Sequence, residues 1–372
     1  RSDAAILYRS NAQSRVFEEI LLDVGMPYRV YGGLRFFERA EIKDALAYLR
    51  ILASRQDDPS FERIVNVPTR GIGNKTIEHL REHARTNQLS LWESALASLN
   101  SQQMTKRSAQ ALYGFVELIN DMGTDIEGLP LGDQVEVVLR KSGLIKHYRK
   151  ERGEKAEARV ENLEELVNAA RNFEHDPDDE IEELSSFLAH AALEAGDSQA
   201  EEWEDCVQLM SLHSAKGLEF PLVFLTGMEE GLFPHQRSLQ EPGRLEEERR
   251  LCYVGMTRAM EQLYVTYAEV RRLHGRESYT SPSRFVAEIP AQFIEEVRSG
   301  FTLRSKTASS VPPNETDTGD GMRLGDQVRH NTFGDGTVLN IEGRGQYTRV
   351  QVNFETVGSK WLVLAYANLQ LL

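Results

Sequence analysis

The most constraining feature of this chain is a pair of short apolar runs that flank a polar, glycine-containing loop. Residues 207–213 and 222–225 are mostly apolar and suit two buried strands. Residues 214–220, Ser-Ala-Lys-Gly-Leu-Glu-Phe, lie between them and predict an exposed loop. The rest of the chain is organised around this strand, loop and strand.

The amino-terminal segment supplies a second set of α/β elements. Residues 4–8 read as a strand, residues 9–11 as the turn that leaves it, and residues 27–31 as another strand. An amphipathic helix is expected over residues 13–24, before Gly25. Its apolar residues recur at helical spacing: Val16, Ile20 and Val24. Alternating strands and helices are typical of an α/β sheet, so we expect one α/β domain split by an insertion.

A charged helix is predicted after the second apolar run, over residues 244–259, with Leu251 and Val254 on its inner face. Arg258 lies at its end. A planar, always-charged guanidinium at such a position suits the charge of a phosphoryl-transfer transition state. An arginine-rich helix taken alone is more often a solvated surface helix, so this reading depends on the neighbouring motifs.

Together these motifs resemble those of superfamily 1 DNA helicases of the UvrD/PcrA/Rep type. The loop at residues 214–220 resembles motif V, and residues 246–259 resemble motif VI. The resemblance covers nearly all of the chain. It implies a RecA-like domain 2A, interrupted by a helical domain 2B, in the carboxyl-terminal half of an ATP-dependent 3′-to-5′ helicase. It also implies roles in excision and mismatch repair.

The resemblance assigns three residues to ATP. Arg258 would reach the γ-phosphate of ATP held by the other motor half, domains 1A and 1B. Glu219 would accept a hydrogen bond from a ribose hydroxyl, although a lone loop glutamate is more often simply solvated. Gly217, which has no side chain, would let the loop lie close beside the phosphates. The Mg²⁺ ligands and the phosphate-loop lysine would lie on the other half, and we expect no metal site in this chain.

The resemblance also assigns contacts to single-stranded DNA, at Arg9, Asn11, Ser211, His213 and His274. Ser211 replaces the usual threonine of the family but keeps the hydroxyl. A lone histidine such as His213 is more often a packed residue than a ligand. His274 stands where the family has tyrosine or phenylalanine, and an imidazole stacks less strongly on a base than a larger ring.

The segment Pro-Thr-Arg-Gly-Ile-Gly-Asn-Lys-Thr at residues 68–76 has two readings. Two glycines between helices allow a close backbone approach, and the amides that open the next helix suit an anion. The alternative is an ordinary tight turn. The resemblance favours a grip on duplex phosphates by Arg70, Gly71, Ile72, Gly73, Lys75 and Thr76. Residues 73–76 are not a phosphate loop, since no glycine precedes the lysine and no apolar strand precedes the segment.

The composition of the chain limits its general affinity for nucleic acid, the roles of its cysteines and the chance of a membrane helix. The formal net charge of −15 argues against a general affinity for nucleic acid. The acid is uneven, however: residues 174–205 hold thirteen Asp or Glu and no Lys or Arg, while basic residues cluster near positions 140–150. Cys206 and Cys252 are the two cysteines, which fits packing roles in a reducing cytoplasm. No apolar run approaches the roughly 18 residues of a membrane helix.

The carboxyl-terminal segment differs from the rest of the chain in composition and in its pattern of predicted elements. Residues 300–320 are polar and rich in Ser, Thr, Pro and Gly, which is typical of a linker. From residue 321, short alternating strands separated by Gly or Asp suggest a small all-β, SH3-like or Tudor-like barrel. The predicted domains are 2A in two parts (1–34 and 197–298), 2B (35–196), a linker (299–320) and the barrel (321–372).

The absence of one motif separates the functional hypotheses. No G-x-x-x-x-G-K-[ST] motif occurs in the 372 residues. The main reading is therefore the carboxyl-terminal half of a helicase that is inactive by itself. The rivals are a non-catalytic fragment that binds DNA or a protein, and a helicase–nuclease subunit, which would carry clustered acids after motif VI. By resemblance the barrel's partner is RNA polymerase, repair proteins are further partners, and the location is the cytoplasm, at the nucleoid.

Overall fold

A computed structural model of the chain forms two compact units, residues 1–295 and 296–372. The structure describes residues 1–101, 104–151, 153–175, 181–196, 200, 204–239, 243–273, 276–297, 327–330, 333–342, 349–354, 358–363, 367 and 369–371. The predicted linker at 299–320 and the predicted base contact at His274 lie outside these residues. None of the described helices is long and apolar enough to cross a membrane.

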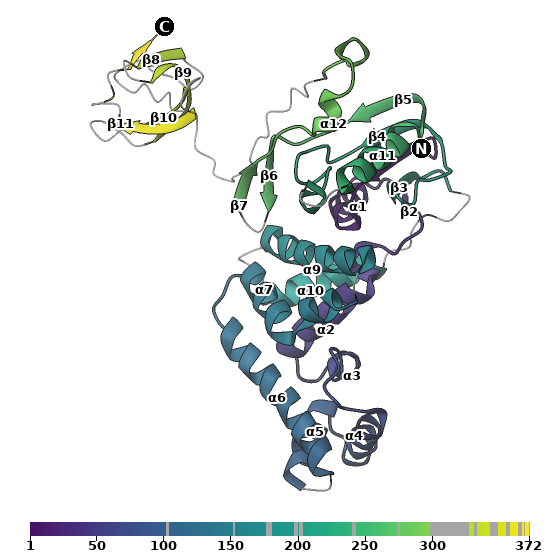
Figure 1. Ribbon diagram of the computed structural model, residues 1–372. Coiled ribbons are helices and arrows are strands. Elements are labelled where there is room, and N and C mark those ends of the chain that lie inside the picture. The colour runs from purple at the N-terminus through teal and green to yellow at the C-terminus, as the bar shows by residue number, and fades with distance from the viewer. Residues whose placement is uncertain are drawn as a thin grey trace. The chain divides into compact units, whose positions relative to one another are not determined.

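The first unit contains a five-stranded parallel sheet, with the chain's amino terminus at its first strand (Figure 1). Its strands are β1 (Ala4–Tyr8), β2 (Tyr28–Val30), β3 (Val207–Ser211), β4 (Phe220–Leu225) and β5 (Ala259–Val265). Their order is β2-β3-β1-β4-β5, so strands from both ends of the insertion interleave. This confirms the predicted α/β domain split by an insertion.

Alternate residues of β1 serve opposite faces of the sheet, as a strand's two-residue period requires. Ala5 and Leu7 pack in the core that includes Cys252 of α11 (Arg244–Met256). Tyr8 packs on the other face, in a core that includes Leu21 of α1 (Ser14–Asp23). Both faces of the central strand are therefore covered, which explains its uninterrupted apolar sequence.

The orientation of α1 differs from the expected one. Val16, Ile20 and Val24, the apolar stripe seen in the sequence, are 43%, 53% and 63% exposed. The inward face instead holds Ser14, Arg15, Glu18 and Leu21. Polar partners on the insertion draw this face inward, and a single-sequence pattern contains no sign of them.

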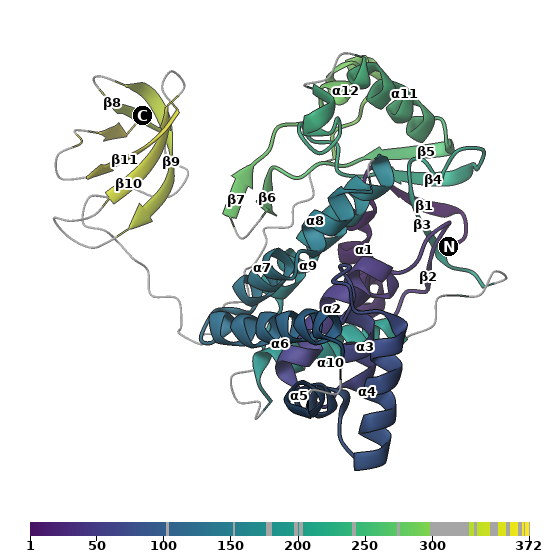
Figure 2. The ribbon, with the colours of Figure 1, turned by 60° about the horizontal axis from the view of Figure 1, so that its bottom comes forward.

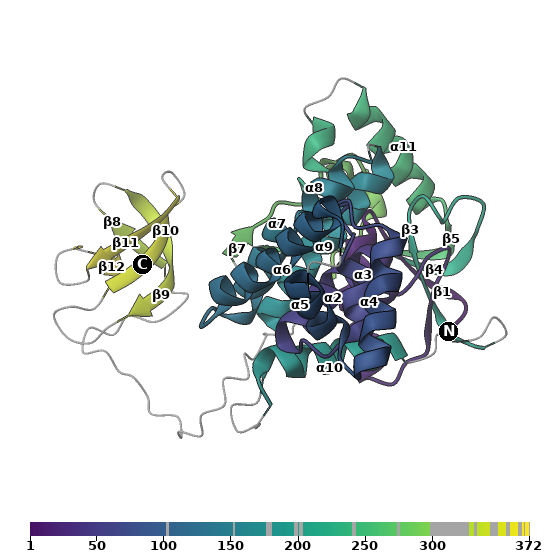
Figure 3. The ribbon, with the colours of Figure 1, turned by 90° about the horizontal axis from the view of Figure 1, so that it is seen from below.

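The interval between β2 and β3 is almost entirely helical, as expected (Figures 2 and 3). Its helices are α2 (Ala40–Ala53), α3 (Asp58–Ile64), α4 (Asn74–Asn87), α5 (Leu91–Ser101), α6 (Lys106–Ile126), α7 (Leu131–Ser142), α8 (Leu144–Arg149), α9 (Glu154–Asn172) and α10 (Glu183–Gly196), with the short 3₁₀ turn η2 (Phe36–Glu38) before them. They share one large apolar core that is separate from the cores of the sheet.

A buried polar cluster joins the helical insertion to the sheet. Glu18, 2% exposed, accepts from the Ser14 hydroxyl at 2.6 Å and from the Phe36 amide at 3.0 Å. Arg39 donates to the Ser14 hydroxyl at 2.7 Å and to Asn162 Oδ1 of α9 at 2.9 Å. Because a buried charge that loses its partners costs several kcal/mol, this cluster fixes how the first turn of the insertion leaves the sheet.

Smaller elements complete the first unit. They are the 3₁₀ turns η1 (Asn11–Gln13), η3 (Gln236–Leu239) and η4 (Ala291–Phe293), the antiparallel pair β6 (Val270–Leu273) and β7 (Arg276–Tyr279), and α12 (Arg284–Ala287). Glu229, fully buried, receives the guanidinium of Arg271 in an ion pair and so ties β6 to the segment after β4.

The second unit is a five-stranded antiparallel sheet, ordered β11-β10-β9-β8-β12. Its strands are β8 (Gln327–His330), β9 (Gly334–Glu342), β10 (Arg349–Phe354), β11 (Gly358–Val363) and β12 (Gln370–Leu371). Val328, Val350 and Val352 form its own buried core. The predicted small all-β domain is thereby confirmed.

Candidate nucleotide and nucleic-acid interface

The predicted single-strand contacts Arg9, Ser211 and His213 lie at one edge of the parallel sheet. Tyr8 and Ser211 are register partners at the carboxyl ends of β1 and β3. The Leu212 amide donates to the Tyr8 carbonyl at 2.9 Å, which holds the two exits together. Arg9 and His213 therefore leave the sheet side by side. The parallel sheet, rather than any local motif, brings these distant segments to one edge.

The predicted nucleotide residues lie at the opposite edge. Gly217 and Glu219 immediately precede β4, and Arg258 immediately precedes β5. β4 and β5 are parallel, with Phe220 paired to Ala259, and the Phe220 amide donates to the Arg258 carbonyl at 2.9 Å. The three residues that the sequence assigned to ATP thus lie at the amino ends of two neighbouring strands.

Arg258 is anchored to the loop before β4. Its Nη1 donates to the Leu218 carbonyl at 2.7 Å, its Nε to the Val254 carbonyl at 2.9 Å and its Nη2 to Thr257 Oγ1 at 3.1 Å. A guanidinium carries five N–H donors, so two remain for another acceptor. The helix α11 ends at Met256, and Arg258 therefore projects from the turn after it instead of from the helix itself.

The loop at residues 212–219 connects the two edges. Because β3 and β4 run in the same direction, the chain has to return along the sheet, roughly 20 Å for a six-residue strand. Gly217 has φ +89°, and a Cβ built there meets nothing within 4 Å. Glu219 and His213 are exposed. The loop offers an open backbone beside Arg258 at one end and side chains at the single-strand edge at the other.

Arg9 has a protein partner that the sequence did not indicate. Its guanidinium forms three hydrogen bonds to Glu248 of α11, from Nε to both carboxylate oxygens and from Nη2 to Oε1, and Glu248 is 5% exposed. Burial is the largest single influence and would raise the pKa of Glu248. The hydrogen bonds and charge of Arg9, together with hydrogen bonds from the His235 amide and Ser238, outweigh it and hold the pKa below its ordinary value. Arg9 thus ties the single-strand edge to the helix that leads to Arg258. Asn11 lies two residues farther on and is exposed.

The helix α11 buries a narrower face than expected. Cys252, Gly255 and Glu248 are its buried residues, while Leu251 and Val254 are only partly covered. A Cβ on Gly255 would lie 2.5 Å from Leu212 Cδ2, so a glycine is needed where the helix meets the loop. The Cys252 thiol is buried, and burial raises its pKa to about 12, which fits the predicted packing role.

The Gly71-Ile72-Gly73 turn lies between α3 and α4, in the helical insertion. Gly71 has φ +84° and an open surface, and Ile72 is fully buried as the anchor of the turn. Gly73 is the N-cap of α4 and makes no side-chain cap. Hydrogen bonds among the described residues leave the amides of Gly73, Asn74 and Lys75 unpaired, as an anion site requires. The Lys75 side chain is exposed, whereas Thr76 is buried.

Arg70 points into the insertion. Its Nη1 donates to the carbonyls of Ile64 at 3.0 Å and Pro68 at 3.1 Å, and its Nη2 to the Ser142 carbonyl at 3.0 Å. Its guanidinium also lies 5.6 Å from the Phe115 ring. The backbone of this turn, rather than the Arg70 side chain, is the part available to a phosphate.

Asn66 shapes the candidate anion-binding turn, and the sequence analysis did not single it out. Its Oδ1 accepts from the amides of Arg70 at 2.8 Å and Ile72 at 3.3 Å, so it sets the shape of the glycine turn. An asparagine that bonds a following backbone is a common turn device, and that was the available signal.

Comparisons with known proteins agree with this geometry. A model of the UvrD-like helicase C-terminal domain matches residues 1–270, and one of the PcrA/UvrD tudor domain matches residues 324–370. DNA helicase II of Salmonella typhimurium and of Escherichia coli are 55% and 54% identical to the chain, over 99% of it and 52% of their own length. ATP-dependent DNA helicase PcrA of Bacillus subtilis is 40% identical over the same shares. The chain spans about half the length of these relatives.

The two glycines of the turn allow a paired test. Gly71→Ala places a side chain at positive φ and should lower the stability of the chain by about 1–2 kcal/mol. Gly73→Ala has ordinary backbone angles and open space, so it should cost at most about 1 kcal/mol as a weaker N-cap. Its methyl group, however, lies at the unpaired amides of α4. We expect it to weaken binding to a duplex with a single-stranded tail and to leave binding to plain single strand unchanged.

Thermal melting and salt titration of both DNA substrates measure these effects. The slope of log K against log salt should fall by about 0.9 for each duplex phosphate that the variant no longer binds. Equal duplex affinity and equal slopes for wild type and Gly73→Ala would make the segment an ordinary helix–helix turn.

Proposed function

The chain belongs to the UvrD-like helicase family, and from this premise we propose that it forms the carboxyl-terminal half of an ATP-dependent 3′-to-5′ DNA helicase. Its relatives carry the names DNA helicase II and ATP-dependent DNA helicase PcrA. The observation that carries the proposal is the anchoring of Arg258 on the Leu218 carbonyl, next to Gly217 and Glu219.

The residues fit a shared ATP site. ATP with Mg²⁺, held by the amino-terminal motor half, would supply the γ-phosphoryl group that is transferred to water. Arg258 keeps two N–H donors for that group, and its other three bonds hold the guanidinium in place before the substrate arrives. The exposed Glu219 carboxylate accepts a hydrogen bond from a ribose hydroxyl, and the open Gly217 backbone leaves room for the phosphates.

Coupling to DNA follows from the loop at residues 212–219. The single-strand contacts Arg9, Asn11, Ser211 and His213 stand at one end of this connection, and the nucleotide residues stand at the other. A shift of Arg258 on hydrolysis moves the loop through the Leu218 carbonyl. The same shift changes the grip on the single strand at the far edge, while the Gly71–Gly73 turn holds the duplex. Alternating grip would then advance the motor along one strand.

The cellular setting is a further part of the proposal. We assign the whole protein to the cytoplasm, at the nucleoid, with roles in excision and mismatch repair alongside repair proteins. The second unit has its own core and matches a tudor domain, which suits a protein-binding role. RNA polymerase is the partner proposed for it, on the family resemblance.

A second candidate is a non-catalytic fragment that binds DNA or RNA polymerase without turnover. The absence of G-x-x-x-x-G-K-[ST] from the 372 residues favours it for the isolated chain.

Arg258 provides the test of the ATP assignment. In a full-length helicase that contains this half, Arg258→Ala should slow hydrolysis by about 10³-fold, the scale for a transition-state arginine, and should leave ATP binding nearly unchanged. The matched control is Arg250→Ala in α11, the helix that ends just before Arg258, since the Arg250 side chain is 76% exposed and pairs with Glu247. Steady-state ATPase and nucleotide-binding titrations measure both. A decrease of less than tenfold for Arg258→Ala would leave this arginine with only its structural bonds.

The second unit generates a separate prediction. Deleting residues 321–372 from the full-length protein should spare ATPase and unwinding and abolish binding to RNA polymerase, because the unit has an independent core. Pull-down, unwinding and thermal melting are measured together. A collapse of the motor's melting temperature, or undiminished polymerase binding, would contradict the assignment.

A further inference from the structure

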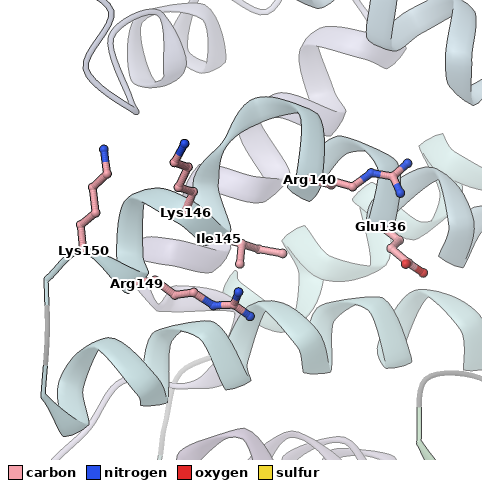
Figure 4. A pocket seen from close by; sticks show the side chains of 6 residues that line it. All are labelled: Glu136, Arg140, Ile145, Lys146, Arg149 and Lys150. Atoms are coloured by element: carbon pink, nitrogen blue, oxygen red, sulfur yellow. The ribbon is translucent and has the colours of Figure 1, made fainter.

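The helical insertion carries a basic pocket that neither the nucleotide site nor the glycine turn uses. Its volume is about 600 Å³, and it lies where α7 meets α8 (Figure 4). The lining residues are Glu136 and Arg140 of α7, Ile145, Lys146 and Arg149 of α8, and Lys150 at the end of α8. The whole chain has a net charge of −15, so four cationic side chains around one pocket give this part of the surface the opposite charge.

The pocket keeps a net positive charge after its ion pairs are counted. Glu136, the one carboxylate in the lining, accepts from Arg171 of α9 at 2.6 Å. Arg149 reaches Glu164 at 3.9 Å only through solvent-exposed atoms, a pairing worth little. No hydrogen bond or ion pair among the described residues engages the side chains of Arg140, Lys146 or Lys150. Those three charges are therefore free for a ligand.

The helix α8 is held rigidly on its opposite face. Leu144 and Tyr148 are buried, and the Tyr148 hydroxyl donates to Asp44 of α2 at 2.5 Å. Lys146 and Lys150 are four residues apart and share the outward face, from which Figure 4 shows them projecting together. Lys146 and Lys150 therefore project from a helix whose position is fixed by its buried face.

The α7–α8 junction beside the pocket contacts the segment that leads into the Gly71–Gly73 turn. Arg70 Nη2 donates to the carbonyl of Ser142, the residue before Gly143 at the α7–α8 junction. A Cβ on Gly143 would lie 3.8 Å from Pro68 Cγ. The α7–α8 junction therefore contacts Pro68 and Arg70 just before the glycine turn, and Lys146 follows Gly143 by three residues, roughly 4.5 Å along a helix. Both elements belong to the helical insertion, so one duplex could contact the amides of α4 and the cations of α8.

The chemistry of the lining favours nucleic acid over a protein partner. Protein interfaces are depleted in lysine and depend on buried aromatic or aliphatic anchors, and the one apolar residue of this lining is the half-buried Ile145. Lysine and arginine without base-reading partners are typical of contacts to a phosphate backbone.

We propose that Arg140, Lys146 and Lys150 bind the phosphate backbone of duplex DNA and extend the contact made by the Gly71–Gly73 turn. The inference rests on the proposed function and deepens it, since it assigns a second duplex contact on the helical insertion. The proposed contact is to the phosphate backbone, so it should be independent of base sequence.

Salt titration of the 372-residue chain on a tailed duplex and on plain single strand tests the proposal. Lys146→Ala/Lys150→Ala removes two phosphate contacts, so the slope of log K against log salt should fall by about 1.8 on the tailed duplex. Between 50 and 200 mM salt the affinity of the wild type should then decrease by about tenfold more than that of the variant. Plain single strand should show no difference.

Two matched variants separate the pocket from bulk charge. Lys146→Arg/Lys150→Arg should keep the wild-type slope. Lys106→Ala/Arg107→Ala removes the same charge at the far end of α6, roughly 28 Å along that helix from Asp125, the partner of Lys141 beside the pocket. This second control should leave the duplex slope unchanged.

The outcomes distinguish the two proposals. A chain that binds neither DNA substrate overturns both the pocket and the DNA-binding part of the proposed function. A wild-type chain that binds the tailed duplex, with an unchanged slope for Lys146→Ala/Lys150→Ala, overturns the pocket alone and returns the patch to a protein partner or to solvent. An equal decrease in Lys106→Ala/Arg107→Ala also overturns it, because bulk charge then explains the effect.

Discussion

The hydrogen bond from Arg258 to the Leu218 carbonyl is the contact on which the rest of the site depends. It ties the turn after α11 to the loop that returns from β3 to β4. Because the guanidinium is fixed by two further bonds within its own turn, its position is set before any phosphate is present. Preorganised donors of this kind are the largest single contribution in many enzymes. A cation that can act on ATP is thereby joined mechanically to the segment that begins at the DNA edge.

The parallel sheet explains why the connection from β3 to β4 runs between the proposed single-strand site and the proposed nucleotide site. Strands that run the same way put their carboxyl ends at one edge and their amino ends at the other, and a direct connection between β3 and β4 has to cross between them. Ser211 begins this crossing and Glu219 ends it. The ion pair between Arg9 and Glu248 adds a second link, from the DNA edge to α11. In the proposed site, short, packed elements would therefore connect the nucleotide to the single strand.

Much of this was predictable from sequence because it depends on local pattern: the strands around residues 214–220, the helical insertion, the all-β tail and the residues that meet near Arg258. The failures share one physical cause. Hydrophobic spacing in α1 predicted Val16 inward, but buried polar partners on the insertion turn Glu18 inward instead. Arg70 was likewise predicted to contact duplex phosphates, yet its guanidinium donates to the backbone carbonyls of Ile64 and Ser142. Polar contacts between segments far apart in sequence leave no periodic signal.

The central claim is that this chain contributes the arginine and the loop of an ATP site but does not hold the phosphates by itself. ATP hydrolysis by the purified 372-residue chain, with and without single-stranded DNA, tests that claim most directly. No turnover above background is expected under either condition, since no phosphate loop occurs in the sequence. DNA-stimulated hydrolysis that tracks the concentration of the chain through purification, and that falls in Arg258→Ala, would contradict the account.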